Sequence, residues 1–249
     1  MEAILKSGAV SDDFLNSIRQ DKRKGVIKAL TRYRDRERQK ELESKRLKEL
    51  LQIEEIYFCR GYNLIAGVDE AGRGSLAGPV VTAAVILPRG EELFFQGLKD
   101  SKKISTAKRD ELYEIIMKRA VGVSVAIVDQ VVIDRINIHR ASLLAMKQSL
   151  EKLSPTPEMA LIDGFTLPES SILHEKVLKG DSRSLSIAAA SVMAKVTRDR
   201  LMEKIHTQYP AYNFQKNKGY PTSEHKKALL KLGPSPVHRR SFIKKIFGG

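Results

Sequence analysis

Short runs of apolar residues, each bounded by Gly, Pro or Asp, recur after residue 63 and predict buried strands. Between these runs, apolar side chains return every three or four residues, which is the spacing of a helix packed along one face. Strands with helices interleaved predict an α/β core. The predicted strands are LIAGVD (64–69), PVVTAAVILP (79–88), VGVSVAIVD (121–129), MALIDG (159–164) and ILHEKVLKG (172–180).

The predicted helices of this part of the chain have recognisable ends. The helix over residues 105–120 begins at Ser105, a residue type that caps helix N-termini. A second helix is predicted over residues 137–153. A third, over residues 184–208, opens with consecutive alanines, which allow close packing on the sheet.

The first sixty residues follow a different pattern. Between Asp12 and Tyr57 there is one Gly and no Pro, and oppositely charged side chains recur at helical spacings. We therefore predict a basic helical N-terminal extension over residues 1–60 and a second domain over residues 61–249. The arginine-rich half of the extension fits either contact with phosphates or an ordinary surface helix.

The net charge of the chain indicates the kind of partner that it binds. The 249 residues carry a net charge of +14, and residues 175–249 hold 16 Lys and Arg against 5 Asp and Glu. A concentrated basic region is typical of proteins that bind polyanions, although it also serves solubility. We expect a nucleic-acid partner.

The composition also restricts the compartment. The longest apolar runs, such as VVTAAVIL, are too short to span a bilayer, and a single cysteine, Cys59, excludes an internal disulfide. These features predict a cytoplasmic protein with no membrane partner. We expect a monomer.

Four acidic residues lie where predicted elements begin or end: Asp69, Glu70, Asp163 and Asp181. The ends of strands in an open α/β sheet border one crevice, so these acids can meet. Neighbouring strand residues point to opposite faces, so Asp69 and Glu70 share a site only if the chain turns there, as Gly72 permits. Each acid could instead be a turn former or, for Asp181, a helix cap.

Clustered carboxylates would need a cation between them. They repel one another and raise one another's pKa unless positive charge is near. Oxygen ligands without neighbouring Cys or His favour Mg²⁺ or Mn²⁺ over zinc. Two such ions can activate a water and stabilise the leaving oxygen of a phosphodiester. The spacing alone leaves both interpretations open, a metal site and a set of turn residues.

Five segments occur in an order that closely resembles the bacterial ribonuclease HII family: VDEAGRGSLAGPV, LKDSKKIS, LIDGF, KGDSRSLSIAAASVMAKVTRDR and KGYPT. The resemblance covers about residues 63–249. It implies a ribonuclease H-like fold, with a central mixed five-stranded sheet flanked by helices and a helical C-terminal part. Arg73 favours this type over the sister type, ribonuclease HIII. These segments do not say whether the N-terminal extension clamps substrate, contacts a partner or covers the core.

The resemblance implies that the four acids are catalytic. In that family they bind two divalent ions, Mg²⁺ or Mn²⁺, and the RNA strand of RNA–DNA hybrids is cleaved to leave 3′-hydroxyl and 5′-phosphate ends. Incision 5′ of ribonucleotides embedded in duplex DNA gives the implied role in ribonucleotide removal. The matching positions are Asp69, Glu70, Asp163 and Asp181.

The resemblance also implies substrate contacts. The backbone of Gly72, Arg73 and Gly74 would meet the ribose 2′-hydroxyl at the cleaved position, the group that separates RNA from DNA. Tyr220 would stack on the next, deoxyribose sugar. Two lysines that match a family pair are assigned to phosphate; they are Lys102 and Lys103.

Two other functions stay open at this point. A ribonuclease H-like DNA nuclease or resolvase would share the fold and the acids and would cut branched DNA. A non-catalytic binder would give no product with either ion. The loop that reads the 2′-hydroxyl and the presence of all four acids favour the ribonuclease.

The remaining features are secondary. The C-terminal SFIKKIFGG fits a sliding-clamp docking tail, but a terminal helix turn is the preferred interpretation. The five histidines show no ligand spacing, and we expect them at the surface or in helix caps; His225, near KGYPT, could touch phosphate.

Overall fold

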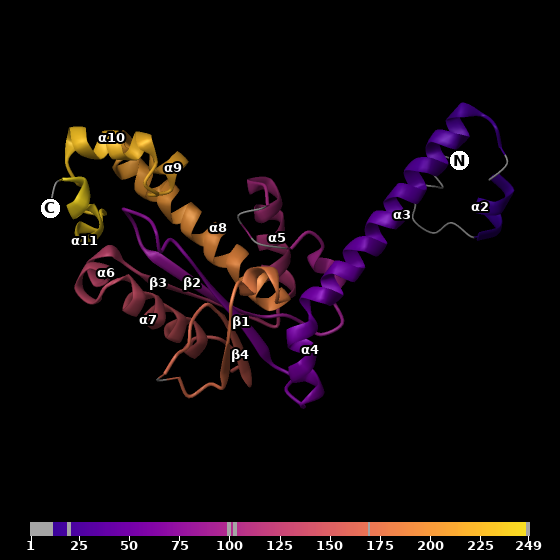
Figure 1. Cartoon of the computed structure of the whole chain (residues 1–249), viewed down its shortest axis with the longest axis horizontal. Helices are drawn as coiled ribbons and strands as arrows, with labels where there is room; N and C mark the ends of the chain where they lie inside the picture. The colour runs from indigo at the N-terminus through magenta and orange to yellow at the C-terminus, as the bar shows by residue number, and fades with distance from the viewer. Residues whose placement is uncertain (1–11, 19–20, 99–100, 102–103, 169, 248–249) are drawn as a thin grey trace. The chain divides into compact units, whose positions relative to one another are not determined.

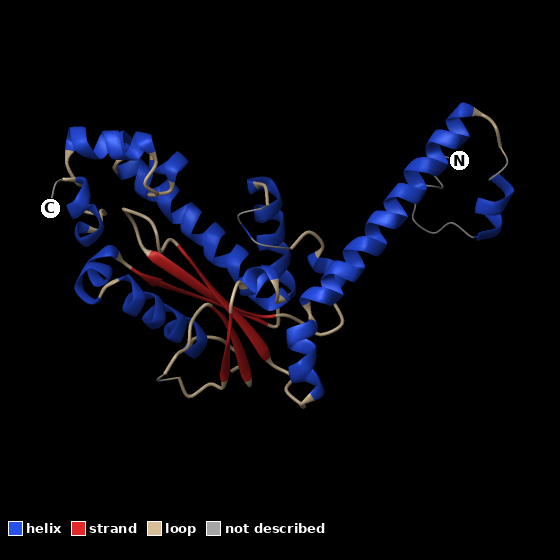
Figure 2. Ribbon diagram, in the orientation of Figure 1, coloured by secondary structure: helices blue, strands red, loops and turns tan. Residues whose placement is uncertain are grey.

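The apolar runs of the sequence form one sheet, and its central strands are buried on both faces. In this computed structural model, which describes residues 12–18, 21–98, 101, 104–168 and 170–247, the strand order is β3-β2-β1-β4-β5 (Figure 2). β1 pairs antiparallel with β2 and parallel with β4, so the sheet is mixed, as the resemblance implies. The strands are β1 (Ile65–Ala71), β2 (Val80–Ile86), β3 (Gly122–Val128), β4 (Met159–Asp163) and β5 (His174–Val177).

Helices cover both faces of this sheet (Figure 1). α8 packs on β1 and β2 from one side, and α7 packs on β2 and β3 from the other. The α-helices are α4 (Gln52–Cys59), α5 (Thr106–Arg119), α6 (Gln130–Ile136), α7 (Ile138–Glu151), α8 (Leu185–Gln208), α9 (Phe214–Asn217), α10 (Ser223–Leu232) and α11 (Arg240–Ile243). Short 3₁₀ turns are η1 (Glu92–Phe95), η3 (Gly180–Ser182), η4 (Pro210–Tyr212) and η5 (Lys244–Ile246).

The start of α8 lies directly against β1. A Cβ atom at Gly67 would come within 2.0 Å of the backbone carbonyl carbon of Ser186, so a larger residue does not fit there. Ala188, Ala189 and Ala190 are fully buried in the same turns, which confirms the close packing expected from the alanines. This contact fixes the beginning of α8 next to the strand that carries the first acids.

Two compact units divide the chain, residues 1–48 and residues 49–249. The first unit holds α2 (Asp12–Ile18) and most of α3 (Lys24–Leu50), so the helical character expected of the N-terminal extension is confirmed where the structure describes it. α4 belongs to the second unit, in which Tyr57 packs against apolar residues of β1 and β4. The domain boundary placed at residue 60 stays a prediction.

The sequence predictions do not include α6, a helix of the second unit. Asp129 caps α6 by accepting a hydrogen bond from the Val132 amide at 2.9 Å. Asn137, at φ +68°, then separates α6 from α7 and caps α7 through the Arg140 amide. Two polar caps thus divide one apolar stretch into two helices. The other predicted strands and helices are confirmed, including the cap at Ser105.

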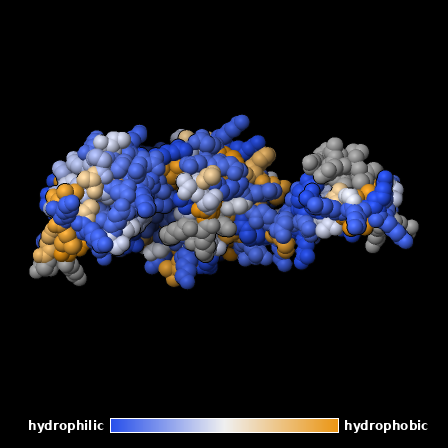
Figure 3. All heavy atoms as spheres, turned by 90° about the horizontal axis from the view of Figure 1, so that it is seen from above, coloured by the Kyte–Doolittle hydropathy of each residue, from blue (hydrophilic) through white to orange (hydrophobic). Residues whose placement is uncertain are grey.

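The C-terminal segment packs onto the second unit. Residues 240–246 form helical turns, and Ile243 is buried in a cluster with Phe214 and Leu229. Hydrophilic residues dominate the face shown in Figure 3. Among the helices that the structure describes, none has an apolar stretch long enough to cross a membrane.

Candidate active site

Parallel pairing of β1 with β4 brings two of the predicted acids to the same end of the sheet. Val68 pairs with Ile162, and Asp69 and Asp163 are the next residues of the two strands. Asp163 Oδ1 accepts a hydrogen bond from the Gly180 amide at 2.6 Å. The strand ends therefore gather the first and third acids and tie the third to the residue that precedes Asp181.

Asp69 lies in a buried and negatively charged environment. Its side chain is buried, and its Oδ1 accepts a hydrogen bond from the Glu70 amide at 2.7 Å. Burial raises the pKa of Asp69 well above its usual value, the charges of Glu70 and Asp163 raise it further, and a hydrogen bond from Ser191 opposes them. The ionised carboxylate is therefore unstable here without added positive charge.

Glu70 is the second acid whose ionised form is disfavoured by its surroundings. Burial raises its pKa to about 7; the Arg73 guanidinium opposes this shift, and the charge of Asp163 adds to it. Arg73 Nη1 lies 3.7 Å from Glu70 Oε1, while Glu70 Oε2 is buried and has no hydrogen-bond partner among the residues described. One carboxylate oxygen is thus free to accept a ligand.

Asp181 lies in η3, between β5 and α8. It does not cap α8, because Ser184 is the N-cap and its hydroxyl accepts a hydrogen bond from the Ile187 amide. The alternative in which Asp181 merely caps the long helix is therefore wrong. Its connection to the other acids runs through Gly180, whose amide binds Asp163.

A pocket of about 380 Å³ opens beside these acids. It contains six of the predicted site residues, whereas Asp163 and Asp181 are not in its lining. Ser101, Ser191 and Lys195 also line it and were not predicted as site residues. Ser191 and Lys195 are four residues apart on α8, a spacing that places them on one helix face and could have identified them. The predicted residues in the lining are Asp69, Glu70, Gly72, Arg73, Gly74 and Tyr220.

The structure does not describe the two lysines that were predicted to contact phosphate. Lys102 and Lys103 lie outside the described residues. Their described neighbour Ser101 is buried, and its hydroxyl lies 2.9 Å from that of Ser191. Ser101, the described residue just before the two lysines, lines the pocket.

The Gly-Arg-Gly loop (residues 72–79) begins with a turn one residue after the strand ends. β1 continues through Ala71, and Gly72 has φ +95°. The expected turn thus follows the acid pair instead of separating it, yet both acids line one pocket. A Cβ at Gly72 would meet Arg198 Nε at 2.0 Å, whereas one at Gly74 would meet nothing within 4 Å. Only Gly72 is sterically required.

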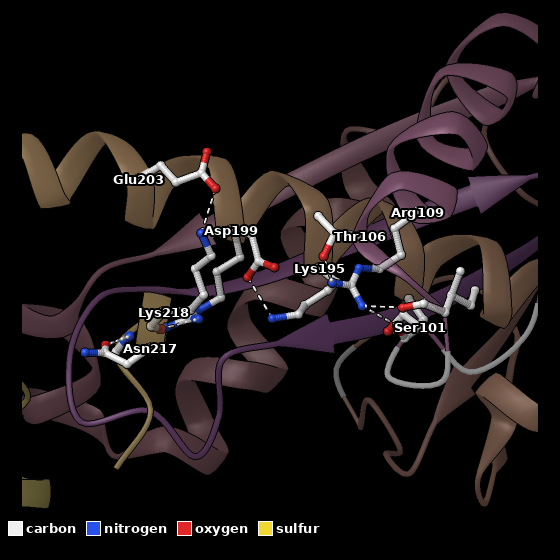
Figure 4. Close-up of polar contacts among 12 residues, drawn as sticks. Ser101, Thr106, Arg109, Lys195, Asp199, Glu203, Asn217 and Lys218 are labelled. Carbon is white, nitrogen blue, oxygen red and sulfur yellow. Dashed lines mark hydrogen bonds and ion pairs between the residues drawn. The ribbon is translucent and has the colours of Figure 1, made fainter. Parts of the chain in front are cut away.

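The basic residues of α8 have structural as well as surface roles. Lys195 Nζ is 2.7 Å from Asp199 Oδ1, and Figure 4 shows this pair beside that of Lys218 and Glu203. These pairs line a polar groove of about 660 Å³ next to the acid pocket. Arg198 is fully buried. Arg198 therefore has a structural role instead of a surface one.

Tyr220 is held by a buried pair of histidines. The Tyr220 carbonyl lies 2.9 Å from His225 Nδ1, and His225 Nε2 lies 3.0 Å from His238 Nε2. Both histidines are buried, so the expectation of surface or capping positions, and of phosphate contact at His225, is wrong for this pair. Lys195 lies over the Tyr220 ring, 5.4 Å from its centroid.

The donor chemistry of the pocket fits a hard divalent cation. The acids offer only oxygen atoms, burial and mutual repulsion disfavour their charged forms, and Glu70 Oε2 lacks a partner in the described chain. No three Asp, Glu, His or Cys side chains among the described residues are arranged to hold one ion. The fit therefore rests on donor type and electrostatics, not on a coordination geometry.

Comparison with known proteins identifies the family. The family described as Ribonuclease HII matches residues 66–245, and the one described as Ribonuclease HII N-terminal domain matches residues 1–58. Ribonuclease HII of Enterococcus faecalis is 49% identical, over 97% of this chain and 93% of that protein. Ribonuclease HII of Bacillus subtilis is 46% identical, over 93% of this chain and 89% of that protein.

Solved structures share the fold. Ribonuclease H2 from Pyrococcus horikoshii matches with a TM-score of 0.62 and 25% identity, over 73% of this chain and 96% of that chain. RNase HII from Archaeoglobus fulgidus, solved in a complex with PCNA, matches with a TM-score of 0.58 and 29% identity, over 68% of this chain and 87% of that chain. The ribonuclease H-like fold implied by the sequence is confirmed. The chain belongs to the ribonuclease HII family and is a ribonuclease H, a hydrolase; membership of this family supports endoribonuclease activity on RNA–DNA hybrids.

Proposed function

We propose that this enzyme incises on the 5′ side of ribonucleotides embedded in duplex DNA, as well as in RNA–DNA hybrids, leaving 3′-hydroxyl and 5′-phosphate ends. The observation that carries the proposal is the pocket in which Asp69 and Glu70 lie beside the Gly-Arg-Gly loop. Two acids with raised pKa values supply the chemistry, and an adjacent backbone supplies contacts to a sugar. The cellular role is ribonucleotide removal from DNA in the cytoplasm.

Two divalent ions, Mg²⁺ or Mn²⁺, complete the proposed site. Such ions would activate a water and stabilise the leaving oxygen. A ribonuclease HIII of the same fold, 22% identical to this chain with a TM-score of 0.54, has been solved in complex with Mn²⁺. The residues proposed to hold the ions are Asp69, Glu70, Asp163 and Asp181.

The protein's own groups have separate tasks in this proposal. Asp69 and Glu70 present oxygen atoms at the end of β1, and Arg73 keeps positive charge beside Glu70. The backbone amides of the loop would meet the sugar, and the space around Gly74 is open, with no atom within 4 Å of a Cβ placed there. Tyr220, which lines the same pocket, would offer its ring to the next sugar.

The decisive substrate is a DNA duplex with one ribonucleotide, incubated with Mg²⁺ or Mn²⁺ and mapped for the position of the cut. We expect a single incision 5′ of the ribonucleotide, with a 3′-hydroxyl end. Cleavage of an all-DNA branched substrate instead would support a DNA nuclease. Binding of the duplex without any product would support a non-catalytic protein. Either result would overturn the proposal.

Asp69→Asn tests the role of the acids on the same substrate. The amide keeps the shape of the side chain and removes its charge, so we expect duplex binding to persist and cleavage to fall by at least about 100-fold. Substantial remaining activity would contradict the metal role of Asp69. An equal loss of binding would show that Asp69 supports the fold instead.

The C-terminal residues are a candidate surface for a protein partner. The A. fulgidus RNase HII was solved with PCNA, and we propose a comparable sliding-clamp contact near the C-terminus, where Phe247 is 47% exposed. Ile243 is buried, so the contact would use only the last residues.

We propose that the protein is a monomer. We also propose that its N-terminal helices contact nucleic acid. Deletion of the extension would then raise KM with little change in kcat.

A further inference from the structure

Two buried arginines lie behind the Gly-Arg-Gly loop. Arg198 and Arg239 are both 0% exposed, although removing a guanidinium from water is costly unless hydrogen bonds satisfy it. All of the hydrogen bonds described for the two guanidiniums go to backbone carbonyl oxygens. The partners of these groups are therefore segments of backbone.

Arg239 connects the two ends of the loop. Its Nη2 donates to the Gly72 carbonyl at 2.7 Å and its Nη1 to the Arg73 carbonyl at 2.8 Å. Its Nε donates to the Gly78 carbonyl at 3.0 Å. Because a guanidinium is planar and rigid, one side chain fixes the distance between the first and last turns of the loop.

Arg198 connects the loop to the segment that carries Tyr220. It donates to the carbonyls of Ala77 at 3.1 Å, Pro79 at 2.9 Å and Lys218 at 2.9 Å. Its guanidinium also lies against the Tyr220 ring, 5.3 Å from the centroid. The missing Cβ of Gly72 provides the space in which this side chain lies.

The result is a loop with its acceptors occupied and its donors available. The carbonyls of Gly72 and Arg73 are held from behind, while the amides of Arg73 and Gly74 donate to no acceptor among the described residues. Arg73 and Gly74 are exposed and line the acid pocket. Water can satisfy these exposed amides, and a bound ligand can take its place.

We propose that Arg198 and Arg239 are positioning residues for sugar recognition, an inference that rests on the proposed function. They hold the carbonyls of the Gly-Arg-Gly loop so that its amides stay directed at the sugar of the cleaved nucleotide. Neither arginine touches substrate. Both act through the backbone that does.

Lysine substitutions test this role because they keep the charge and remove the planar set of donors. The test variants are Arg198→Lys and Arg239→Lys, and the matched controls are Arg200→Lys and Arg240→Lys, exposed arginines of the same two segments. Single-turnover cleavage is measured on duplexes with one ribonucleotide or one 2′-fluoro nucleotide. Thermal unfolding of each variant is measured first, and cleavage is then assayed at a temperature at which all variants are folded.

In both test variants we expect the rate on the ribonucleotide to fall about 100-fold, the effect of misplacing a contact by about 1 Å. The preference for ribose over the 2′-fluoro sugar should shrink with it, while both controls keep the wild-type rate and preference. A loss of thermal stability with unchanged sugar preference would assign the arginines to stability alone and overturn the inference. Failure of the wild-type enzyme to cleave either duplex would instead refute the proposed function.

Discussion

Two segments that carry predicted site residues are held by buried side chains with opposite hydrogen-bonding roles. The Gly-Arg-Gly loop is fixed by the guanidiniums of Arg198 and Arg239. The Asp181 segment (residues 178–184) is followed by the start of α8, which is fixed by the carboxylate of Glu54. Glu54 Oε1 accepts hydrogen bonds from the Ser186 amide at 3.0 Å and from the Ser184 hydroxyl at 2.6 Å.

The polarity of the backbone explains this difference. The loop turns its carbonyl oxygens inward, so a buried donor must meet them, and arginine supplies several donors in one plane. The first turn of α8 turns its amides outward, as every helix N-terminus does, so a buried acceptor must meet them. Whether the buried side chain donates or accepts is therefore set by the end of the peptide dipole that it faces.

The largest effect is expected from Glu54→Ala. The change leaves the Ser186 amide and two serine hydroxyls buried without their acceptor, which should cost about 3 kcal/mol of unfolding free energy. Because Asp181 lies just before this turn, kcat should also fall. Chemical denaturation and steady-state kinetics measure the two effects.

Glu54→Gln is the matched control for that variant. Glutamine keeps an oxygen for the serines, and burial raises the pKa of Glu54, so loss of the charge is tolerated. We expect about 1 kcal/mol or less of destabilisation. Equal losses in the Ala and Gln variants would show that the charge, not the acceptor, holds α8.

The second effect compares the two glycines of the Gly-Arg-Gly motif. Gly72→Ala places a Cβ against Arg198 at a positive φ, which should cost about 2 kcal/mol and lower cleavage about 100-fold. Gly74→Ala meets no atom within 4 Å and should keep wild-type stability. Thermal unfolding and cleavage of a single-ribonucleotide duplex measure both. Equal destabilisation by the two changes would mean that Arg198 does not depend on the space at Gly72.

Local patterns were sufficient to predict the strands and the acids at their ends. Asp69 and Asp163 follow apolar runs of the type that forms central strands, so their meeting required only the parallel pairing of β1 with β4. Spacing also indicated that α8 would pack closely, because alanine and glycine permit close contact whatever the partner. These features depend on residues within one segment or on general rules of sheets.

The buried anchors could not be predicted in the same way. Arg198, Arg239 and Glu54 occur in charged stretches that look like solvated helix faces. Apart from Lys218, which is 20 residues from Arg198, their hydrogen-bond partners are more than 100 residues away in the chain. The only local signal was that Ser191, Lys195 and Arg198 share one face of α8. Backbone carbonyls have no sequence identity, so a pattern of side chains does not show which arginine will find them.

The third prediction concerns pH, to which the two segments should respond in opposite directions. Burial, and the nearby charge of His225, lower the pKa of His238 to about 4 from its usual 6.5, so its stabilisation is complete above about pH 6.5 and is lost as the pH falls toward 4. Burial raises the pKa of Glu54, so its stabilisation is complete below about pH 4.5 and is lost as the pH rises through the folded-state pKa.

Hydrogen exchange resolves these two responses at single amides. Between about pH 7 and pH 5, the protection factor of the Gly78 amide, which bonds Val237 beside His238, should fall, while that of Ala188 in α8 should not. His139→Asn alters an exposed histidine and should leave both responses unchanged. If both amides lost protection over the same pH range, the prediction that the two segments respond oppositely to pH would be wrong.

The smallest effect is expected from Tyr57→Phe, at the other side of the Asp181 segment. The Tyr57 hydroxyl donates to Glu175 of β5, and burial raises its pKa to about 12, so it remains a donor throughout the neutral range. Its ring is held by apolar neighbours, so loss of the hydroxyl should cost about 1 kcal/mol and leave kcat nearly unchanged. Tyr62→Phe, whose hydroxyl bonds no residue in the described chain, is the control and should cost less. If Tyr57→Phe lowered kcat as strongly as Glu54→Ala, β5 would hold the Asp181 segment as firmly as the start of α8 does, and the single buried carboxylate would no longer explain its position.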